Sequence, residues 1–167
     1  GADGGICVTA SHNPIEYNGL KMVRAESKPI GAESGLAEIR ALAESGDFAE
    51  AQSGGRVVDA SETRADYVDC VAGFVSVNAL KPLKILVNAG NGAAGPSFDA
   101  LAKVLQDKGV PWEFVRMHHA PDGSVPNGIP NPMREENQPA TSAMVRETGA
   151  DLGVAWDGGF DRRCFLD

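Results

Sequence analysis

The stretch after Pro82 most constrains what this chain can fold into. The strand-like run 84–87 is followed by the turn Gly90-Asn91-Gly92 and then by an apolar stripe at helical spacing that Gly109 closes. The residues of the stripe are Phe98, Leu101, Ala102 and Leu105. A strand, a glycine turn and a helix in succession are typical of proteins in which helices cover a mostly parallel sheet. The chain is therefore predicted to be an α/β protein.

Hydrophobic periodicity predicts the other elements. Strands are expected at 5–9, 20–23, 112–117 and 151–155, and helices at 34–44, 62–77 and 141–147. The expected apolar faces of the first two helices are Leu36, Ile39, Leu42 and Ala43, and Tyr67, Val71, Phe74 and Val75. The predicted architecture is layered α/β/α with mostly parallel or mixed sheets. We expect two partial domains, residues 1–79 and residues 80–167, with the boundary near Leu80.

Composition excludes several classes of protein. The formal net charge of -8 argues against nucleic-acid binding, which needs clustered positive charge. No run approaches the ~18 consecutive apolar residues of a membrane span, so no membrane contact is expected. The cysteines Cys7, Cys70 and Cys164 form neither a disulfide framework nor a zinc motif, which favours a cytoplasmic protein. Because the chain begins at Gly1 and not at Met, we expect it to be a piece of a longer protein.

The segment Thr9-Ala10-Ser11-His12-Asn13-Pro14 presents a serine hydroxyl in a loop after a predicted strand. Tyr17-Asn18-Gly19-Leu20-Lys21 follows and adds a lysine. Phosphoryl transfer depends mainly on positioning and charge neutralisation, and a serine on a sharp turn suits it as a carrier. Lys21 would be either a charge partner or a proton-transfer group. A serine hydrolase is disfavoured, because there is no Gly-x-Ser-x-Gly motif and His12 directly follows the serine.

The segment Asp157-Gly158-Gly159-Phe160-Asp161-Arg162 follows the last predicted strand. Asp157 and Asp161 would lie at the carboxyl end of a parallel strand, where open α/β sheets bind their ligands. Magnesium prefers such oxygen ligands and often takes one or two carboxylates together with phosphate oxygens. An EF-hand is excluded because Arg162 occupies the position that needs glycine.

The two segments together resemble the phosphoserine loop and the magnesium loop of the α-D-phosphohexomutases. The resemblance implies an intramolecular phosphotransferase that interconverts hexose 6-phosphate and hexose 1-phosphate through a phosphoserine and a hexose 1,6-bisphosphate. It assigns catalytic roles to Ser11, His12 and Lys21. It assigns phosphate or substrate binding to Asn13 and Arg162. It assigns Mg²⁺ to Ser11, Asp157, Gly159 and Asp161.

The resemblance also sets expectations about substrate and partners. Mannose is favoured over glucose, because the segments 122–127 and 131–132 resemble a loop of the bacterial phosphomannomutase branch. In the family, two further domains, the third and fourth, supply the sugar-recognition and phosphate-clamping loops. These domains lie outside this chain, so the isolated chain is expected to be inactive.

Two departures from the family pattern support an alternative. Gly159 stands where the magnesium loop has its middle aspartate, and Arg163 is one arginine more than the family continuation carries. An extra residue at a strand start would turn the following side chains to the opposite face unless a bulge absorbs it. The alternative is a catalytically inactive fragment or degenerate copy with at most weak phosphate or metal binding.

Two weaker signals carry no site. The turn Gly90-Asn91-Gly92 lacks both Gly-x-Gly-x-x-Gly spacing and a Walker lysine, so a tight turn into a helix is expected there. The pair His118-His119 has no acidic or cysteine partner at ligand spacing and is expected to be a surface feature at a strand end.

Overall fold

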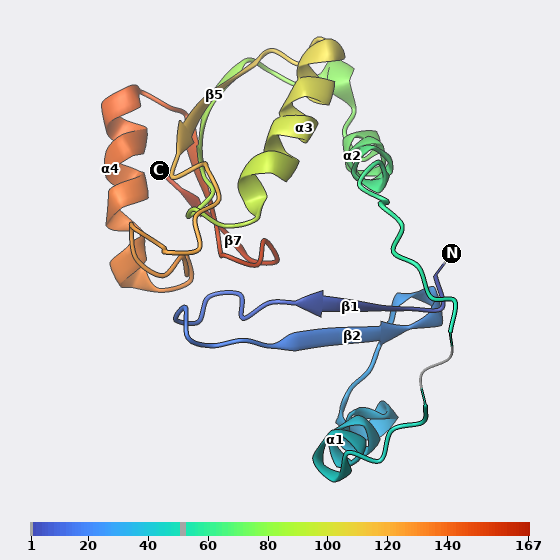
Figure 1. Cartoon of the computed structure of the whole chain (residues 1–167). Helices are drawn as coiled ribbons and strands as arrows, with labels where there is room; N and C mark the ends of the chain where they lie inside the picture. Colours follow the sequence, from blue (N-terminus) through green and yellow to red (C-terminus); the bar gives the residue numbers. More distant parts are fainter. Residues whose placement is uncertain (1, 51–52) are drawn as a thin grey trace. The chain divides into compact units, whose positions relative to one another are not determined.

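The computed structural model describes residues 2–50 and 53–167, which form two compact units (Figure 1). Unit 1 contains the residues up to Thr9 together with Asn18–Ala60. Unit 2 contains Ala10–Tyr17 and Ser61–Asp167. The serine loop thus belongs to unit 2, although the strands on either side of it in the sequence belong to unit 1. The domain boundary near residue 80 stays a prediction.

Unit 1 is an antiparallel sheet with one α-helix. Its strands β1 (Gly4–Val8), β2 (Leu20–Arg24) and β3 (Lys28–Pro29) lie in the order β1-β2-β3. The helical elements are η1 (Ala25–Ser27), η2 (Ala32–Ser34) and α1 (Leu36–Ser45). The expected apolar face of α1 is not buried: Leu36 is 40% exposed and Leu42 is 51% exposed. The amphipathic pattern therefore predicted the helix but not its burial.

Unit 2 is built on a mixed sheet. Its strands lie in the order β5-β4-β6-β7, with β4 parallel to β5 and β6, and β7 antiparallel to β6. The strands are β4 (Leu83–Asn88), β5 (Trp112–Met117), β6 (Leu152–Trp156) and β7 (Arg163–Leu166). The helices are α2 (Thr63–Gly73), η3 (Val77–Ala79), α3 (Ala94–Asp107), η4 (Glu135–Asn137) and α4 (Pro139–Thr148). The predicted α/β class and the mixed sheet are confirmed.

Helices α3 and α4 lie on opposite sides of this sheet (Figure 1). The alternation of side chains along β4 explains the arrangement. Ile85 and Val87 point to the α3 face, where they pack with Phe98 and Ala102. On the other face Nδ2 of Asn88 donates to the hydroxyl of Thr141 in α4, 2.9 Å away. The core thus occupies both faces of β4, the central parallel strand.

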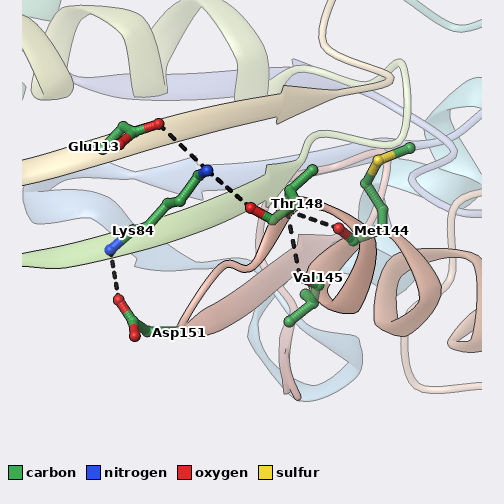
Figure 2. A network of polar contacts seen from close by, with 6 residues as sticks. All are labelled: Lys84, Glu113, Met144, Val145, Thr148 and Asp151. Carbon is green, nitrogen blue, oxygen red and sulfur yellow. Dashed lines mark hydrogen bonds and ion pairs between the residues drawn. The ribbon is translucent and has the colours of Figure 1, made fainter.

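Lys84 ties β4 to its neighbours at the start of the strand (Figure 2). Its Nζ donates to the carbonyl oxygen of Thr148, 2.8 Å away at the end of α4, and lies 3.6 Å from Oε1 of Glu113 in β5. Its backbone N–H donates to Oδ2 of Asp151 over 2.8 Å, just before β6. These contacts hold β4, β5, β6 and α4 at one end of the sheet. The opposite, carboxyl ends of the parallel strands carry the loops of the candidate site.

The apolar face predicted for the helix now seen as α2 is wrong at Tyr67 and Phe74, whereas Val71 and Val75 are partly buried. Its buried residues are Val68 and Ala72, whereas Tyr67 is 52% exposed and Phe74, which follows the last helical residue, is 83% exposed. Ala72 packs with Leu105 of α3. A small side chain lets the two helices approach closely, so the contact with α3 and not the spacing of large residues selects the buried face.

Strand β7 pairs with β6 over four consecutive residue pairs, with Phe165 opposite Val154. No bulge interrupts this pairing, so nothing in it absorbs an additional residue. Phe165 consequently points to the α3 face but remains 62% exposed. It borders an apolar hollow of about 540 Å³ that also reaches Val154 and Phe98.

None of the helices in the described residues is long and apolar enough to span a membrane.

Candidate functional site

The serine loop is a compact turn that places Ser11 in a strained backbone conformation. The backbone N–H and the side-chain amide of Asn13 both donate to the carbonyl oxygen of Ala10, over 3.1 and 2.8 Å. Ser11 between them has φ of 56°, in the left-handed region that residues with a Cβ rarely adopt. Such strain costs about 1–3 kcal/mol and concentrates at functional sites. The turn predicted at Ser11 is confirmed, and it fixes the direction of the hydroxyl.

Asp157 is the buried centre of the second loop. It is 0% exposed and follows β6 directly. Its Oδ1 accepts the backbone N–H groups of Asp161 and Arg162 over 3.0 and 2.9 Å, and its Oδ2 accepts that of Gly159 over 3.3 Å. The loop therefore wraps its own backbone donors around one carboxylate, which compensates for the burial of a charge.

The hydroxyl of Ser11 donates to Oδ2 of Asp157 over 2.5 Å. Burial raises the pKa of Asp157, but Ser11, the N–H groups of Arg162 and Gly159, and Asp161 together stabilise the carboxylate more strongly. The net effect is a pKa below the ordinary aspartate value. Asp157 is therefore ionised at neutral pH and orients the serine hydroxyl.

Glycines at 158 and 159 let the two loops come this close. A Cβ on Gly158 would lie 2.4 Å from the carbonyl oxygen of Ser11, and one on Gly159 would lie 2.7 Å from its Oγ. Gly158 also faces Gly92 in the turn after β4, where a Cβ would lie 2.8 Å from the Gly158 backbone. Residue 159 thus faces the serine hydroxyl directly, and its lack of a side chain leaves Ser11 in contact with Asp157.

His12 and Arg162 flank the serine on its exposed side. Nδ1 of His12 lies 3.2 Å from Oγ of Ser11. The guanidinium NH1 of Arg162 lies 3.3 Å from Nδ1 and 3.2 Å from Nε2 of His12. An arginine beside the imidazole brings positive charge to the place where a phosphoryl group on Ser11 would develop negative charge.

The Ser11 hydroxyl and the Asp157 carboxylate bring together oxygen donors of the kind that a hard cation prefers, and Gly159 adds no carboxylate to them. A phosphate on Ser11 would bring about -1.5 to -2 charges next to the ionised Asp157, which calls for a cation between them. Oδ2 of Asp157 lies 2.5 Å from the Ser11 oxygen, and Asp161, whose backbone N–H bonds to Oδ1 of Asp157, is the other carboxylate of the loop. Among the described residues no three His, Cys, Asp or Glu side chains form a group that could hold a metal ion.

A cavity of about 570 Å³ lies beside the serine loop. His12 and Asn13 of the serine loop line it together with Asn131 and Arg134. Sequence analysis found no chemistry for the segment that carries Asn131 and Arg134. Its asparagines and prolines predicted a loop, but no motif indicated that it would wall a cavity next to Ser11.

Two further features were singled out in the sequence, Lys21 and the pair His118-His119. Lys21 lies in unit 1, on β2 opposite Cys7, so its catalytic role stays a prediction. The pair His118-His119 follows β5 directly, as expected for a strand end, and both residues are partly buried. Burial lowers the pKa of His118, and Nε2 of His119 lies 2.9 Å from Oδ2 of Asp99. This partner lies 20 positions earlier in the sequence, in α3, and spacing alone did not reveal it.

Comparison with known proteins gives the same assignment for both parts of the chain. The family model described as phosphoglucomutase/phosphomannomutase, alpha/beta/alpha domain II, matches residues 65–167. The corresponding model for domain I matches residues 1–50.

Curated relatives and a solved structure are similar along nearly the whole chain. A phosphomannomutase of Salmonella typhimurium is 50% identical over 99% of this chain, and a protein named phosphohexose mutases of Xanthomonas campestris is 48% identical. This chain spans 36% of the length of each. The crystal structure of a phosphoglucomutase/phosphomannomutase family protein from Burkholderia thailandensis has a TM-score of 0.79 and 33% identity. It is matched over 98% of this chain and 33% of its own chain. The chain belongs to the phosphoglucomutase/phosphomannomutase family.

Proposed function

We propose that this chain is the phosphoserine-bearing and metal-binding part of a longer hexose phosphate mutase, called the full-length mutase below. The observation that carries the proposal is the strained Ser11, whose hydroxyl bonds to the buried carboxylate of Asp157. A hydroxyl held in this way, with an arginine nearby, suits reversible acceptance of a phosphoryl group. The reaction would interconvert hexose 6-phosphate and hexose 1-phosphate through a hexose 1,6-bisphosphate.

The residues of the chain divide the work of the transfer. When a hexose 1,6-bisphosphate phosphorylates Ser11, the Oγ–P bond forms and the sugar O–P bond breaks, while Oγ loses a proton and the released sugar oxygen takes one up. Asp157 orients the hydroxyl, and Nδ1 of His12, 3.2 Å away, is a second acceptor within reach of that proton. Arg162 lies where it can pair with phosphate oxygens. Lys21 keeps the role that the family resemblance gives it, as a charge partner or proton-transfer group.

Mg²⁺ would be held by Asp157, Asp161 and an oxygen of Ser11 or of its phosphate. When bound, it would neutralise the phosphoryl oxygens beside the two carboxylates. Because Gly159 contributes no carboxylate, we expect weaker magnesium binding than in a loop with aspartate at that position. Water would supply the ligands that the protein does not, so the reduced set could still hold the ion.

Mannose phosphate is the proposed preferred substrate, with glucose phosphate as the second. The support for mannose comes from relatives named phosphomannomutase at 50% and 47% identity. Both sugars stand in the name of the family. The chain spans about a third of these relatives, so the groups that select the sugar are expected in the third and fourth domains of the full-length mutase.

The second candidate is a degenerate copy that binds phosphate or metal weakly and turns nothing over. Gly159 favours it, because the magnesium loop lacks one carboxylate.

A coupled assay on the full-length mutase distinguishes the two candidates. Mannose 1-phosphate and glucose 1-phosphate are supplied in turn, each together with Mg²⁺. We expect turnover of both sugar phosphates and a higher kcat/KM for mannose 1-phosphate. Ser11→Ala should reduce turnover to background, whereas the matched change Ser45→Ala, on the exposed helix α1, should leave it intact. Background activity in the unmodified protein supports the degenerate copy. Full activity of Ser11→Ala contradicts the proposed mechanism.

A further inference from the structure

The cavity beside the serine loop shares a residue with the reacting centre. His12 lines the cavity and also lies 3.2 Å from the Ser11 hydroxyl through its Nδ1. A molecule in the cavity would therefore contact the neighbour of the phosphorylated oxygen. The volume of about 570 Å³ lies within the range of small-molecule sites. The cavity thus has both the location and the size for a sugar phosphate.

The second segment that lines the cavity, residues 129–137, is a preformed loop. Nδ2 of Asn137 donates to the carbonyl oxygens of Ile129 and Asn131, 3.3 and 2.9 Å away. The carbonyl oxygen of Pro130 accepts the N–H of Gly158 over 3.3 Å. The loop is therefore attached to the same turn that holds Asp157. A wall fixed to the reacting loop can position a ligand relative to Ser11 without reordering.

Arg134 gives this wall a positive charge that can bind an anionic ligand. The chain has 23 acidic and 15 basic residues, so an arginine that lines a cavity is a local exception to the overall charge. Arg134 is such a residue, and its NH1 lies 3.2 Å from Oε1 of Glu136, which also lines the cavity. Both side chains are about two-thirds exposed, 66% and 64%, so solvent screens the pair and a phosphate can displace the glutamate.

We propose that this cavity is a subsite for the hexose phosphate and that Arg134 is a positioning residue for its phosphoryl group. The inference rests on the proposed mutase function. When no substrate is bound, the carboxylate of Glu136 pairs with the guanidinium of Arg134. The phosphoryl group of the bound substrate replaces this carboxylate. Arg134 acts on binding and does not touch the oxygen of Ser11 that carries out the transfer.

Removing Arg134 and removing the charge of Glu136 should change KM of the full-length mutase in opposite directions. Arg134→Ala should raise KM for mannose 1-phosphate about tenfold and change kcat by less than about twofold, as expected for a charge-assisted hydrogen bond to bound substrate. Arg134→Lys should recover part of the loss, because the charge remains but the fork geometry does not. Glu136→Gln should lower KM, because it removes the competing carboxylate.

Arg40→Ala is the matched control, since Arg40 is also exposed and paired with a glutamate, Glu44, but lies in α1. It should leave KM unchanged. An unchanged KM in both Arg134→Ala and Glu136→Gln would overturn the subsite, and so would a rise in KM that Arg40→Ala shares.

Phosphate on Ser11 must be measured in the same variants after incubation with a hexose 1,6-bisphosphate. Normal Ser11 phosphorylation with an unchanged KM overturns the subsite alone. Absence of phosphate on Ser11 in the unmodified protein overturns the proposed function, and the subsite with it.

Discussion

The hydroxyl of Ser11 bonds over 2.5 Å to the carboxylate of Asp157, a residue 146 positions later in the chain. This single contact joins the turn that carries the serine to the turn that ends β6. It gives both motifs one shared centre within unit 2. It also explains the glycines at 158 and 159, because a Cβ at these positions would lie 2.4 Å from the carbonyl oxygen and 2.7 Å from Oγ of Ser11.

Replacing Asp157 by asparagine should destabilise unit 2 by about 1.5–3 kcal/mol, because a buried carboxylate that accepts several hydrogen bonds is lost. The two tryptophans of the chain, Trp112 and Trp156, both lie in unit 2, so their fluorescence during urea unfolding reports on this unit. Asp107→Asn is the control, because Asp107 forms an exposed pair with Lys103 and should contribute at most about 1 kcal/mol. Equal stability of the two variants would mean that Asp157 contributes no more than a surface charge.

The stability difference between the unmodified chain and Asp157→Asn should depend on pH. The pKa of Asp157 is lowered in the folded state, so the unfolded chain binds the proton more readily. The stabilisation by Asp157 is therefore fully present above the unfolded value of about 3.9 and is lost as pH falls through the lower folded pKa. Urea unfolding between pH 6 and pH 3 should show the stability difference between the unmodified chain and Asp157→Asn shrinking at the acidic end. A difference that grows on acidification would contradict the lowered pKa.

Gly158→Ala should displace the serine turn, because the new Cβ would lie 2.4 Å from the carbonyl oxygen of Ser11. We expect a loss of about 1–3 kcal/mol in stability and slower phosphorylation of Ser11 in the full-length mutase. Gly123→Ala serves as the control, since its Cβ would meet nothing within 4 Å. If the two alanine variants behave alike in both measurements, the close approach of the two loops is not required.

Gly159→Asp should strengthen magnesium binding in the full-length mutase. Residue 159 faces Oγ of Ser11, so the new side chain would separate Ser11 from Asp157 and add a third carboxylate. The magnesium concentration for half-maximal rate should fall by about tenfold or more, the size of effect that changes around metal ligands typically have. Gly123→Asp adds the same charge elsewhere and should not alter the titration. An unchanged magnesium dependence in Gly159→Asp would mean that this residue does not face the ion.

The regular parts of the fold were predictable because their signals are local. The strand predicted at 112–117 has the same bounds in the structure, where it is β5 (Trp112–Met117). The buried face of α2 was not predictable in this way, because the packing of Ala72 against Leu105 depends on a helix elsewhere in the sequence.

In the candidate site, too, the sequence predicted the local motifs but not the contacts between distant residues. Ser11 and Asp157 were each identified from their motifs, but spacing along the chain could not show that they bond directly. Arg134 belongs to no motif, and only the fold shows that it lines the same cavity as His12.

The 167-residue chain by itself should show no measurable mutase activity in the coupled assay. Substrate positioning can supply ~7–11 kcal/mol of a barrier, and the third and fourth domains are expected to provide much of it. The control is the full-length mutase at the same concentration. Activity that persists in the short chain through successive purification steps would show that the site is complete without those domains.

The central claim is that Ser11 carries the phosphoryl group, and a phosphopeptide map tests it most directly. The full-length mutase is incubated with mannose 1,6-bisphosphate and Mg²⁺, digested, and analysed by tandem mass spectrometry. We predict a phosphate on the peptide that contains Ser11, and no phosphorylation of this peptide in Ser11→Ala. Phosphate found only on other peptides, or none on an enzyme that turns over, would contradict the account.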